Sequence, residues 1–467
     1  MDLGRHFYLN KVLEQYAARP ATRMTLRQLV FFGRTLGRDR EKILKSGNYV
    51  RQELAVRIAH RIRDLQALPF VVMTNKHLEE VYEKYWTAFE TFRKVPNIRT
   101  MEDNEEFCAT LKRLLDDHLT IIPSLTIGIV ESSHHLPSDQ LDGFMERMLR
   151  SRISRRVLAE QHIALSEALD DPFHFFNDSA SSHESSANSG DGDHIGIIYT
   201  NLKVSSVISK VVGLLTKIFQ DEVQAGIRTG DAAVIPSVVI DGALDTRFAY
   251  IPEHLEYIFF ELLKNSMTAV MRQPLSARDP VTIRATIVEG PPDEDLIVRV
   301  SDCGGGLPDL LTKLSGSHAR REHRRKHSQP VSDALLAAIT SFSNVRRRLE
   351  IEDEEVRKAS ITSQHKAQVD TEVNASSSTN SSEESHSTSQ RPDVESPGGE
   401  KEALKESVPR SSLTRQETGL GLPMTKIYTD FFGGSLNLRS LDGHGMDVYV
   451  RLPKLGTNKE AIEEIVL

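Results

Sequence analysis

Residues 261–265 combine side chains that suit a magnesium-bound nucleotide. Glu261 supplies a carboxylate, Asn265 supplies an amide four residues later, and Lys264 stands beside them. Residues at this spacing on a helix project from one face, so the carboxylate and the amide can reach the same ligand. Taken alone, such a pair is more often part of a solvated helix face than of a binding site.

A second segment, residues 302–306, begins with Asp302, a carboxylate that can accept a hydrogen bond from the amino group of adenine. Gly304 and Gly306 follow it, and glycine lets the backbone approach a flat base or a ribose closely. A third segment, residues 419–422, places Gly419 and Gly421 just before a predicted helix. Free backbone N–H groups and the positive end of the helix dipole attract phosphate oxygens there.

These three segments, in this order, predict a nucleotide site of a particular kind. The chain contains no Gly-x-x-x-x-Gly-Lys-Ser/Thr sequence, so it is not a P-loop protein. It also lacks the His-Arg-Asp and Asp-Phe-Gly sequences of the common protein kinases. Glu261, Asn265 and Asp302 are therefore expected to belong to a different ATP-binding fold.

Composition favours a soluble enzyme. The 467 residues suffice for two domains, and the net charge of -8 gives no reason to expect nucleic acid as a partner. With Cys108 and Cys303 as its two cysteines, the chain is expected to function in a reducing compartment. No apolar run is long enough to span a bilayer. The N-terminal residues lack an apolar signal core and make a poor transit peptide.

Residues 1–190 are predicted to form a helical bundle, because apolar residues recur there at steps of three and four. Leu54, Ile58 and Ile62 form one such stripe. His162 follows a basic cluster on a predicted helix of this region. It is either a phospho-accepting histidine or a packed helix residue, and we favour the packed residue.

Residues 195–455 alternate between strand-like and helix-like segments, which predicts an α/β sandwich. Strands are expected over residues 281–287, 296–301, 435–440 and 446–452, and helices after Pro252 and after Gly421. Residues 352–414, rich in Ser and Glu and nearly without aromatic residues, are predicted to be a disordered insertion in the region of an ATP lid.

The ordered segments resemble the N, G1 and G2 boxes of the ATPase fold of Hsp90, gyrase B, MutL and the histidine kinases. A closer resemblance is to the mitochondrial 2-oxo-acid dehydrogenase kinases, which include the pyruvate and branched-chain dehydrogenase kinases. The matching segments are residues 51–69, 151–163, 252–269 and 433–452, the last being most similar to the branched-chain member.

This resemblance implies an α+β fold, with an all-α bundle for lipoyl-core docking and regulation followed by the ATP-binding domain. It implies a homodimer that uses ATP and Mg²⁺, with K⁺ as a further candidate cation, in the mitochondrial matrix. The implied activity is phosphorylation of a serine in the decarboxylase component of the dehydrogenase complex, which inactivates that complex. The lipoyl domain of the acyltransferase core would be the docking site.

The same resemblance assigns roles to individual residues. Glu261 would orient or deprotonate the attacking serine hydroxyl, and Asn265 would hold Mg²⁺. Asp302 would bind adenine. The residues that would line the nucleotide or contact its phosphates are Gly304, Gly306, Gly419, Leu420, Gly421 and Leu422.

Four residues depart from the family pattern. Tyr257 stands where a histidine is common in the pyruvate type, and Cys303 replaces the arginine of Asp-Arg-Gly-Gly-Gly. Met446 replaces the threonine of Gly-x-Gly-Thr-Asp, which removes a hydroxyl near the adenine. Thr268 stands where an arginine is usual.

These departures leave two alternatives beside the protein-serine kinase. One is a histidine kinase, which would need a phospho-accepting histidine such as His162. The other is a catalytically silent regulatory subunit of the same complex. Spacing and motifs do not separate pyruvate from branched-chain complexes as the substrate.

Overall fold

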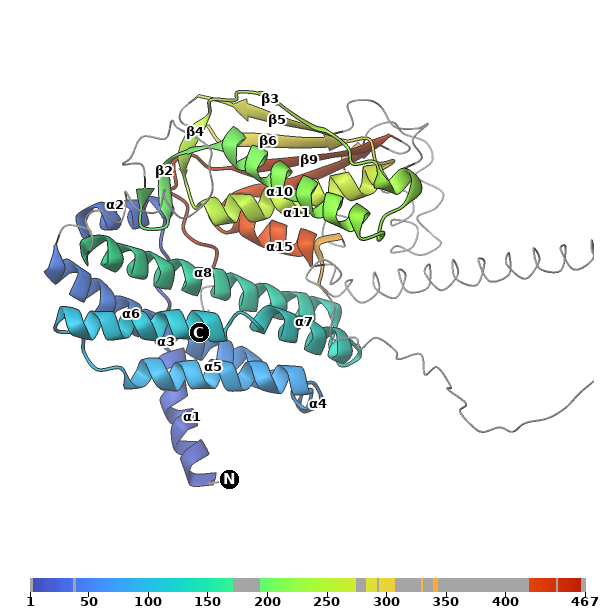
Figure 1. Ribbon diagram of the computed structural model, residues 1–467. Coiled ribbons are helices and arrows are strands. Elements are labelled where there is room, and N and C mark those ends of the chain that lie inside the picture. The colour runs from blue at the N-terminus through green and yellow to red at the C-terminus, as the bar shows by residue number, and fades with distance from the viewer. Residues whose placement is uncertain are drawn as a thin grey trace, which may run out of the picture. The chain divides into compact units, whose positions relative to one another are not determined.

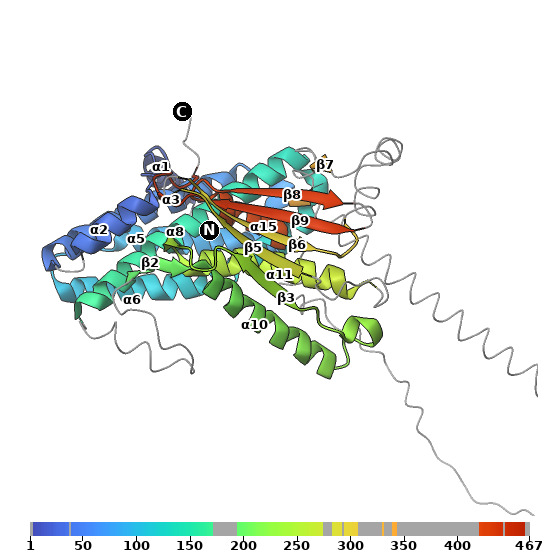
Figure 2. The ribbon, with the colours of Figure 1, turned by 90° about the horizontal axis from the view of Figure 1, so that it is seen from above.

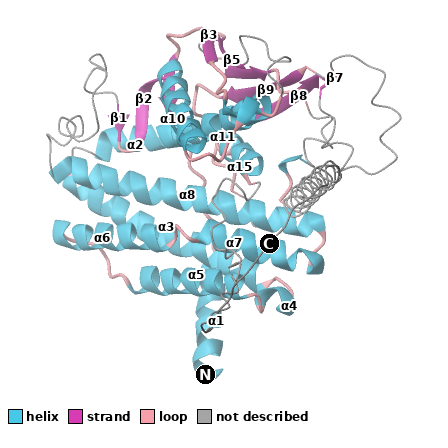
Figure 3. Ribbon diagram, turned by 45° about the vertical axis from the view of Figure 1, so that its right-hand side comes forward, coloured by secondary structure: helices cyan, strands magenta, loops and turns pink. Residues whose placement is uncertain are grey.

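The computed structural model describes residues 3–36, 39–170, 194–273, 283–291, 294–306, 329–330, 339–342, 420–441 and 444–462. Helices alone are found up to residue 170, and strands accompany helices from residue 194 onward (Figure 3). The predicted α+β class is therefore confirmed. The predicted insertion, residues 352–414, lies outside the described residues.

The N-terminal helices bury the predicted apolar stripes. Ile58 and Ile62 are at most 1% exposed, and so is Tyr85. Local signals fix where helices begin: Thr100 and Asp103 form a capping box at the start of one of them. In chain order the helices are α1 (Leu3–Ala17), α2 (Leu26–Leu36), α3 (Arg40–Gln66), α4 (Phe70–Met73), α5 (Lys76–Lys94), α6 (Met101–Asp117), α7 (Ile121–Ser132), the 3-10 turn η1 (Ser133–His135) and α8 (Ser138–Asp170).

A six-stranded sheet in the order β3-β5-β6-β9-β8-β7 forms the second region, and Figure 2 shows this order from above. Strands β3 and β5 are parallel, and the remaining pairs are antiparallel. The strands are β3 (Val238–Gly242), β5 (Ile283–Glu289), β6 (Leu296–Asp302), β7 (Gln329–Pro330), β8 (Ser435–Leu441) and β9 (Gly445–Leu452). The four predicted strands are confirmed, although the first two residues expected for β5 lie outside the described ranges.

A smaller antiparallel sheet, in the order β1-β2-β4, was not expected from the sequence. Its strands are β1 (His194–Ile195), β2 (Ile198–Lys203) and β4 (Arg247–Tyr250). It adjoins the helical region, because Gln161 of α8 donates to the carbonyl of Ile195 at 3.1 Å and accepts from the N–H of Ile197 at 2.9 Å.

Three helices cover one face of the larger sheet (Figure 1): α10 (Val204–Gln224), α11 (Pro252–Met271) and α15 (Gly421–Asp430). The 3-10 turn η3 (Gly230–Ala233) follows α10. Pro252 opens α11 as predicted, since its fixed φ suits the first helical position. Within the described ranges, no helix is both long and apolar enough to cross a lipid bilayer.

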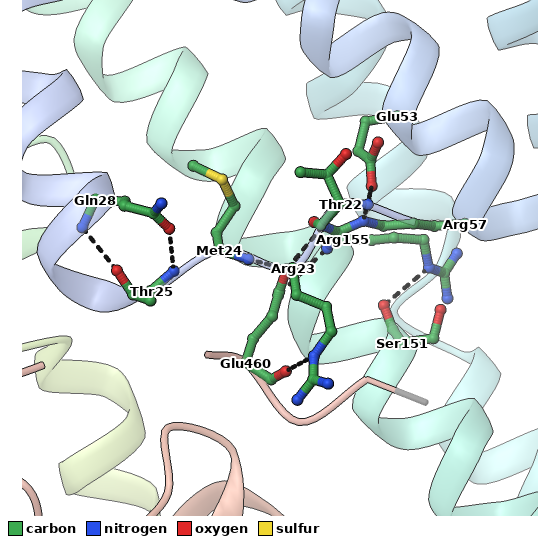
Figure 4. Close-up of polar contacts among 10 residues, drawn as sticks. All are labelled: Thr22, Arg23, Met24, Thr25, Gln28, Glu53, Arg57, Ser151, Arg155 and Glu460. Atoms are coloured by element: carbon green, nitrogen blue, oxygen red, sulfur yellow. Dashed lines mark hydrogen bonds and ion pairs between the residues drawn. The ribbon is translucent and has the colours of Figure 1, made fainter. Parts of the chain in front are cut away.

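The C-terminal strap, residues 453–462, joins the sheet to the helical region. Its Glu460 is 2% exposed and forms an ion pair with the equally buried Arg57 of α3, with Nη2 and Oε1 at 2.7 Å (Figure 4). Glu53 accepts from Nε of Arg57 at 2.9 Å. The strap makes further hydrogen bonds to both regions. The N–H of Glu460 donates to the carbonyl of Met24, and the N–H of Met24 donates to the Glu460 carboxylate. The N–H of Ala461 donates to the carbonyl of Phe431.

We predict that Glu460→Gln lowers the free energy of unfolding by about 3 kcal/mol, because it leaves the buried guanidinium of Arg57 with one carboxylate instead of two. The midpoint of urea unfolding measures this loss. Glu41→Gln is the matched control, since Glu41 pairs with Lys45 at a site where both side chains are more than 70% exposed, and it should leave the midpoint unchanged. Equal midpoints for both variants would contradict the prediction.

Several histidines are buried in the neutral form. Burial, together with the charge of Arg155, lowers the pKa of His118 to about 3. Burial lowers the pKa of His162 to about 4, and burial with the charge of Arg156 lowers the pKa of His254 to about 3. In the unfolded chain these imidazoles would bind protons below about pH 6.5.

Stability should therefore fall as the pH drops from about 6.5 toward 4, by up to about 1.4 kcal/mol per pH unit for each such histidine. The folded pKa values are lowered, so the unfolded state binds more protons throughout this range. Urea midpoints between pH 7.5 and 4.5 test this. His254→Leu should reduce the slope at little cost, because its Nδ1 has no hydrogen-bond partner among the described atoms. A midpoint that does not change with pH would refute the prediction.

Candidate functional site

Helix α11 carries the first predicted segment. The carboxylate of Glu261 is buried, with the residue 6% exposed, whereas Asn265 one turn later is exposed to solvent. Lys264 is half-buried between them. Burial lowers the pKa of Lys264, and the negative charges of Glu261 and Glu222 oppose that shift. The helix thus presents a shielded carboxylate next to an accessible amide oxygen.

The start of α15 lies directly against Glu261. A Cβ atom added to Gly421 would be 2.3 Å from Oε2 of Glu261, closer than any real contact. A larger residue at position 421 would therefore force the Glu261 carboxylate to move. The first N–H groups of α15, including those of Gly421 and Leu422, have no acceptor within the helix, so they can bind anions beside Glu261. Leu420 is the N-cap residue.

We predict that Gly421→Ala lowers kcat by about 10- to 100-fold while the protein remains folded, because the new methyl group would displace the Glu261 carboxylate. The loss of kcat is measured by steady-state kinetics of phosphate transfer from ATP, the activity that the resemblance implies. Gly213→Ala on α10 is the matched control, since a Cβ there meets nothing within 4 Å. That change should keep activity and raise stability by about 0.5–1 kcal/mol. Full activity of Gly421→Ala would show that the contact is unimportant.

Asp302 ends β6 and is held by three donors. Its Oδ1 accepts from the N–H of Gly304 at 3.0 Å and from the N–H of Met446 at 3.2 Å. Its Oδ2 accepts from the hydroxyl of Ser266 at 2.9 Å. Burial raises the pKa of Asp302, and these three hydrogen bonds oppose the shift.

The glycines after Asp302 are needed where the backbone turns and packs. Gly305 and Gly306 have φ of 88° and 78°, in the left-handed region that favours glycine. A Cβ on Gly304 would lie 2.6 Å from the Cβ of Ala269 on α11. Gln273, just beyond α11, donates to the carbonyl of Gly304 at 3.0 Å. This loop is therefore fixed against the end of α11.

Helix α11 consequently joins the three predicted segments. Its Glu261 meets Gly421, while its Ser266 and Ala269 meet residues 302–304. Gly419 lies outside the described residues. Ser266 and Gln273 were missed by the sequence analysis. Ser266 could have been found from the sequence, because a serine within an apolar helical stripe needs a polar partner for its hydroxyl.

The four departures from the family pattern have different surroundings. The ring of Tyr257 packs on that of Tyr428 of α15, with centroids 4.6 Å apart. Cys303 is half-buried and is not part of a disulfide, and Thr268 is half-buried on α11. Met446 contributes its backbone N–H to Asp302, so the loss of a threonine hydroxyl does not remove residue 446 from the site.

His162 is a packed residue. It is 1% exposed, its Nε2 lies 3.0 Å from Oδ1 of Asn104, and its Nδ1 lies 3.3 Å from Oγ of Ser46. Both ring nitrogens therefore have partners inside the helical region. A phosphoryl donor could not reach either nitrogen without opening the helices.

Comparison with known proteins gives a consistent result. Residues 23–199 match a family model described as mitochondrial branched-chain alpha-ketoacid dehydrogenase kinase. Over 97% of its length the chain is 28% identical to pyruvate dehydrogenase (acetyl-transferring) kinase 2, mitochondrial, of Saccharomyces cerevisiae, covering 86% of that protein. Over 96% of its length it is 24% identical to the corresponding mitochondrial kinase of Arabidopsis thaliana, covering 95% of that one.

The resemblance inferred from the sequence is thus borne out by proteins that align along nearly the whole chain. The fold is α+β, and the aligned proteins are mitochondrial kinases. Along nearly its whole length this chain is similar to mitochondrial 2-oxo-acid dehydrogenase kinases.

Proposed function

We propose that this protein is an ATP-dependent protein-serine kinase that phosphorylates and inactivates the decarboxylase component of a mitochondrial 2-oxo-acid dehydrogenase complex. The observation that carries the proposal is the contact of Glu261 with Gly421, together with the attachment of Asp302 to the same helix, α11. A carboxylate, an anion-binding helix start and a base-binding carboxylate are thereby held in one place.

In this proposal the protein mainly positions the reactants, as phosphoryl transfer requires. Glu261 orients the serine hydroxyl or accepts its proton. The first N–H groups of α15 hold phosphate oxygens at the side of Glu261. Asp302 accepts from the amino group of adenine, while Gly304 and Gly306 let the backbone lie close to the nucleotide.

Mg²⁺ fits this site as a metal carried by the nucleotide. It favours oxygen ligands and commonly uses one or two protein groups together with substrate phosphates. The amide oxygen of the exposed Asn265 is the protein group we assign to it. Over the described residues, no cluster of three His, Cys, Asp or Glu side chains could hold a metal ion.

We propose the pyruvate complex as the substrate. Relatives named as pyruvate dehydrogenase kinases align over 96–99% of the chain, whereas the family model described by the branched-chain substrate covers residues 23–199. Docking on a lipoyl domain and assembly as a homodimer belong to the same proposal. All of these relatives are named as mitochondrial proteins, and the chain is accordingly mitochondrial.

The test offers purified pyruvate and branched-chain dehydrogenase complexes side by side with labelled Mg-ATP. We expect phosphate on a serine of the pyruvate complex's decarboxylase component, and loss of that complex's activity. Glu261→Gln should lower kcat by about 10²- to 10⁴-fold with ATP affinity nearly unchanged, because the carboxylate acts on the nucleophile. Glu256→Gln on the same helix is the control, since Glu256 pairs with Lys210 away from the site.

Three results would contradict parts of this proposal. ATP binding without transfer to either complex would indicate a silent regulatory subunit. Transfer to the branched-chain complex alone would correct the substrate. Full transfer by Glu261→Gln would remove the role given to that carboxylate.

A further inference from the structure

Ser266 has a buried hydroxyl to which the proposed mechanism gives no role. The residue is 4% exposed and lies on α11 between Leu262 and Val270, which are both buried. A hydroxyl without a partner in such surroundings would cost free energy. Its partner is Oδ2 of Asp302, at 2.9 Å. Between Leu262 and Val270 the buried face of α11 therefore carries a hydroxyl, and that hydroxyl donates to the carboxylate proposed to bind adenine.

The hydrogen bonds of Asp302 leave little freedom for a ligand. An ionised carboxylate has about four acceptor positions. The N–H groups of Gly304 and Met446 take two on Oδ1, and the hydroxyl of Ser266 takes one on Oδ2. The donors of the described residues thus leave one position on Oδ2. Donors on both oxygens also prevent the carboxylate from rotating about its bond to Cβ.

We propose that Ser266 is a positioning residue for base recognition, which holds the carboxylate of Asp302 so that its remaining acceptor position takes the amino group of adenine. This inference rests on the proposed function and extends it. Adenine presents a donor at its amino group, whereas guanine presents an acceptor oxygen at the equivalent position. A fixed, ionised carboxylate accepts from adenine and repels guanine.

Because of its surroundings, the ionisation of the Asp302 carboxyl depends on the hydrogen bond from Ser266. Burial raises the pKa of Asp302, the charge of Asp447 on β9 adds to that, and the Ser266 hydroxyl opposes it. Arg299 of β6 pairs with Asp447 at 2.9 Å. His444 precedes β9, and Lys264 and Glu261 lie two and five residues before Ser266 on α11. Without the Ser266 hydroxyl the pKa of Asp302 should rise further, so ATP affinity should be lost at a higher pH.

Ser266 also accounts for the departure at Met446. The thioether of Met446 cannot donate a hydrogen bond, although a hydroxyl is the family pattern at this position. The backbone N–H of Met446 already contacts Oδ1 of Asp302, so residue 446 adjoins the carboxylate, and we expect a threonine there to offer its hydroxyl to it. The donor that residue 446 lacks is supplied from α11 by Ser266.

The experiment measures ATP and GTP affinities by calorimetry on the full chain between pH 6 and 8, with steady-state kinetics. Ser266→Ala should weaken ATP binding about tenfold, as for the loss of one hydrogen bond to a charged group, and raise KM with kcat retained. The ratio of ATP affinity to GTP affinity should decrease. The pH below which ATP affinity is lost should be higher than in the wild-type chain. Met446→Thr in the Ser266→Ala background should restore most of the affinity.

Ser166→Ala is the matched control. Ser166 is a buried helical serine of α8 whose hydroxyl donates to the carbonyl of His162 and accepts from Asn104. Its loss should lower stability without changing either nucleotide affinity. ATP affinity, base preference and pH profile that are unchanged in Ser266→Ala would overturn the inference. Equal weakening of ATP and GTP without rescue by Met446→Thr would also overturn it. No ATP binding by the folded wild-type chain would instead refute the proposed function.

Discussion

The burial of one positive charge is the constraint that holds the two ends of this chain together. Arg57 is 1% exposed, and a guanidinium buried so completely is destabilising unless its charge is paired, here by carboxylates. Glu53 comes from the same helix, but Glu460 is 403 residues further along. The strap that delivers Glu460 also bonds through Ala461 to the residue that follows α15. The opposite end of α15 lies against Glu261. A charge buried in the helical region thus fixes the position of the helix whose first turn adjoins the proposed catalytic carboxylate.

Within the site, α11 organises the other elements because its middle and its C-terminal half contact different partners. Its middle places Glu261 against α15, and its C-terminal half contacts the loop after β6 through Ser266 and Ala269. The apolar face of the helix packs on strand β6, whose inward residue Val298 is fully buried. Side chains on one rigid helix keep fixed separations, which suits chemistry that depends on positioning. The loop after β6 is held in place by its contacts with that helix.

Local patterns allowed much of this to be predicted. The alternation in residues 296–301 predicted β6, and Pro252 marked the first residue of α11. The order of the three segments indicated one site, although the sequence alone does not show that Gly421 touches Glu261. Contacts between distant residues leave no local signal, so the pairing of Arg57 with Glu460 could not be predicted. The small sheet was missed because β1 spans two residues and shows no periodicity. Ser266 could have been noticed as a polar interruption of the stripe from Leu262 to Val270.

The relation of Ser266 to Met446 bears on how such a chain can change over generations. A hydroxyl next to Asp302 can come from the helix or from the strand, so the two positions form one interchangeable unit. If the serine arises first, the carboxylate keeps a hydroxyl neighbour at every step, and the threonine then becomes dispensable. If the threonine is lost first, an ancestor would have had neither hydroxyl beside Asp302. A comparison that scores each motif position separately would count Met446 as a loss, although the hydroxyl of Ser266 donates to Asp302 from another element, α11.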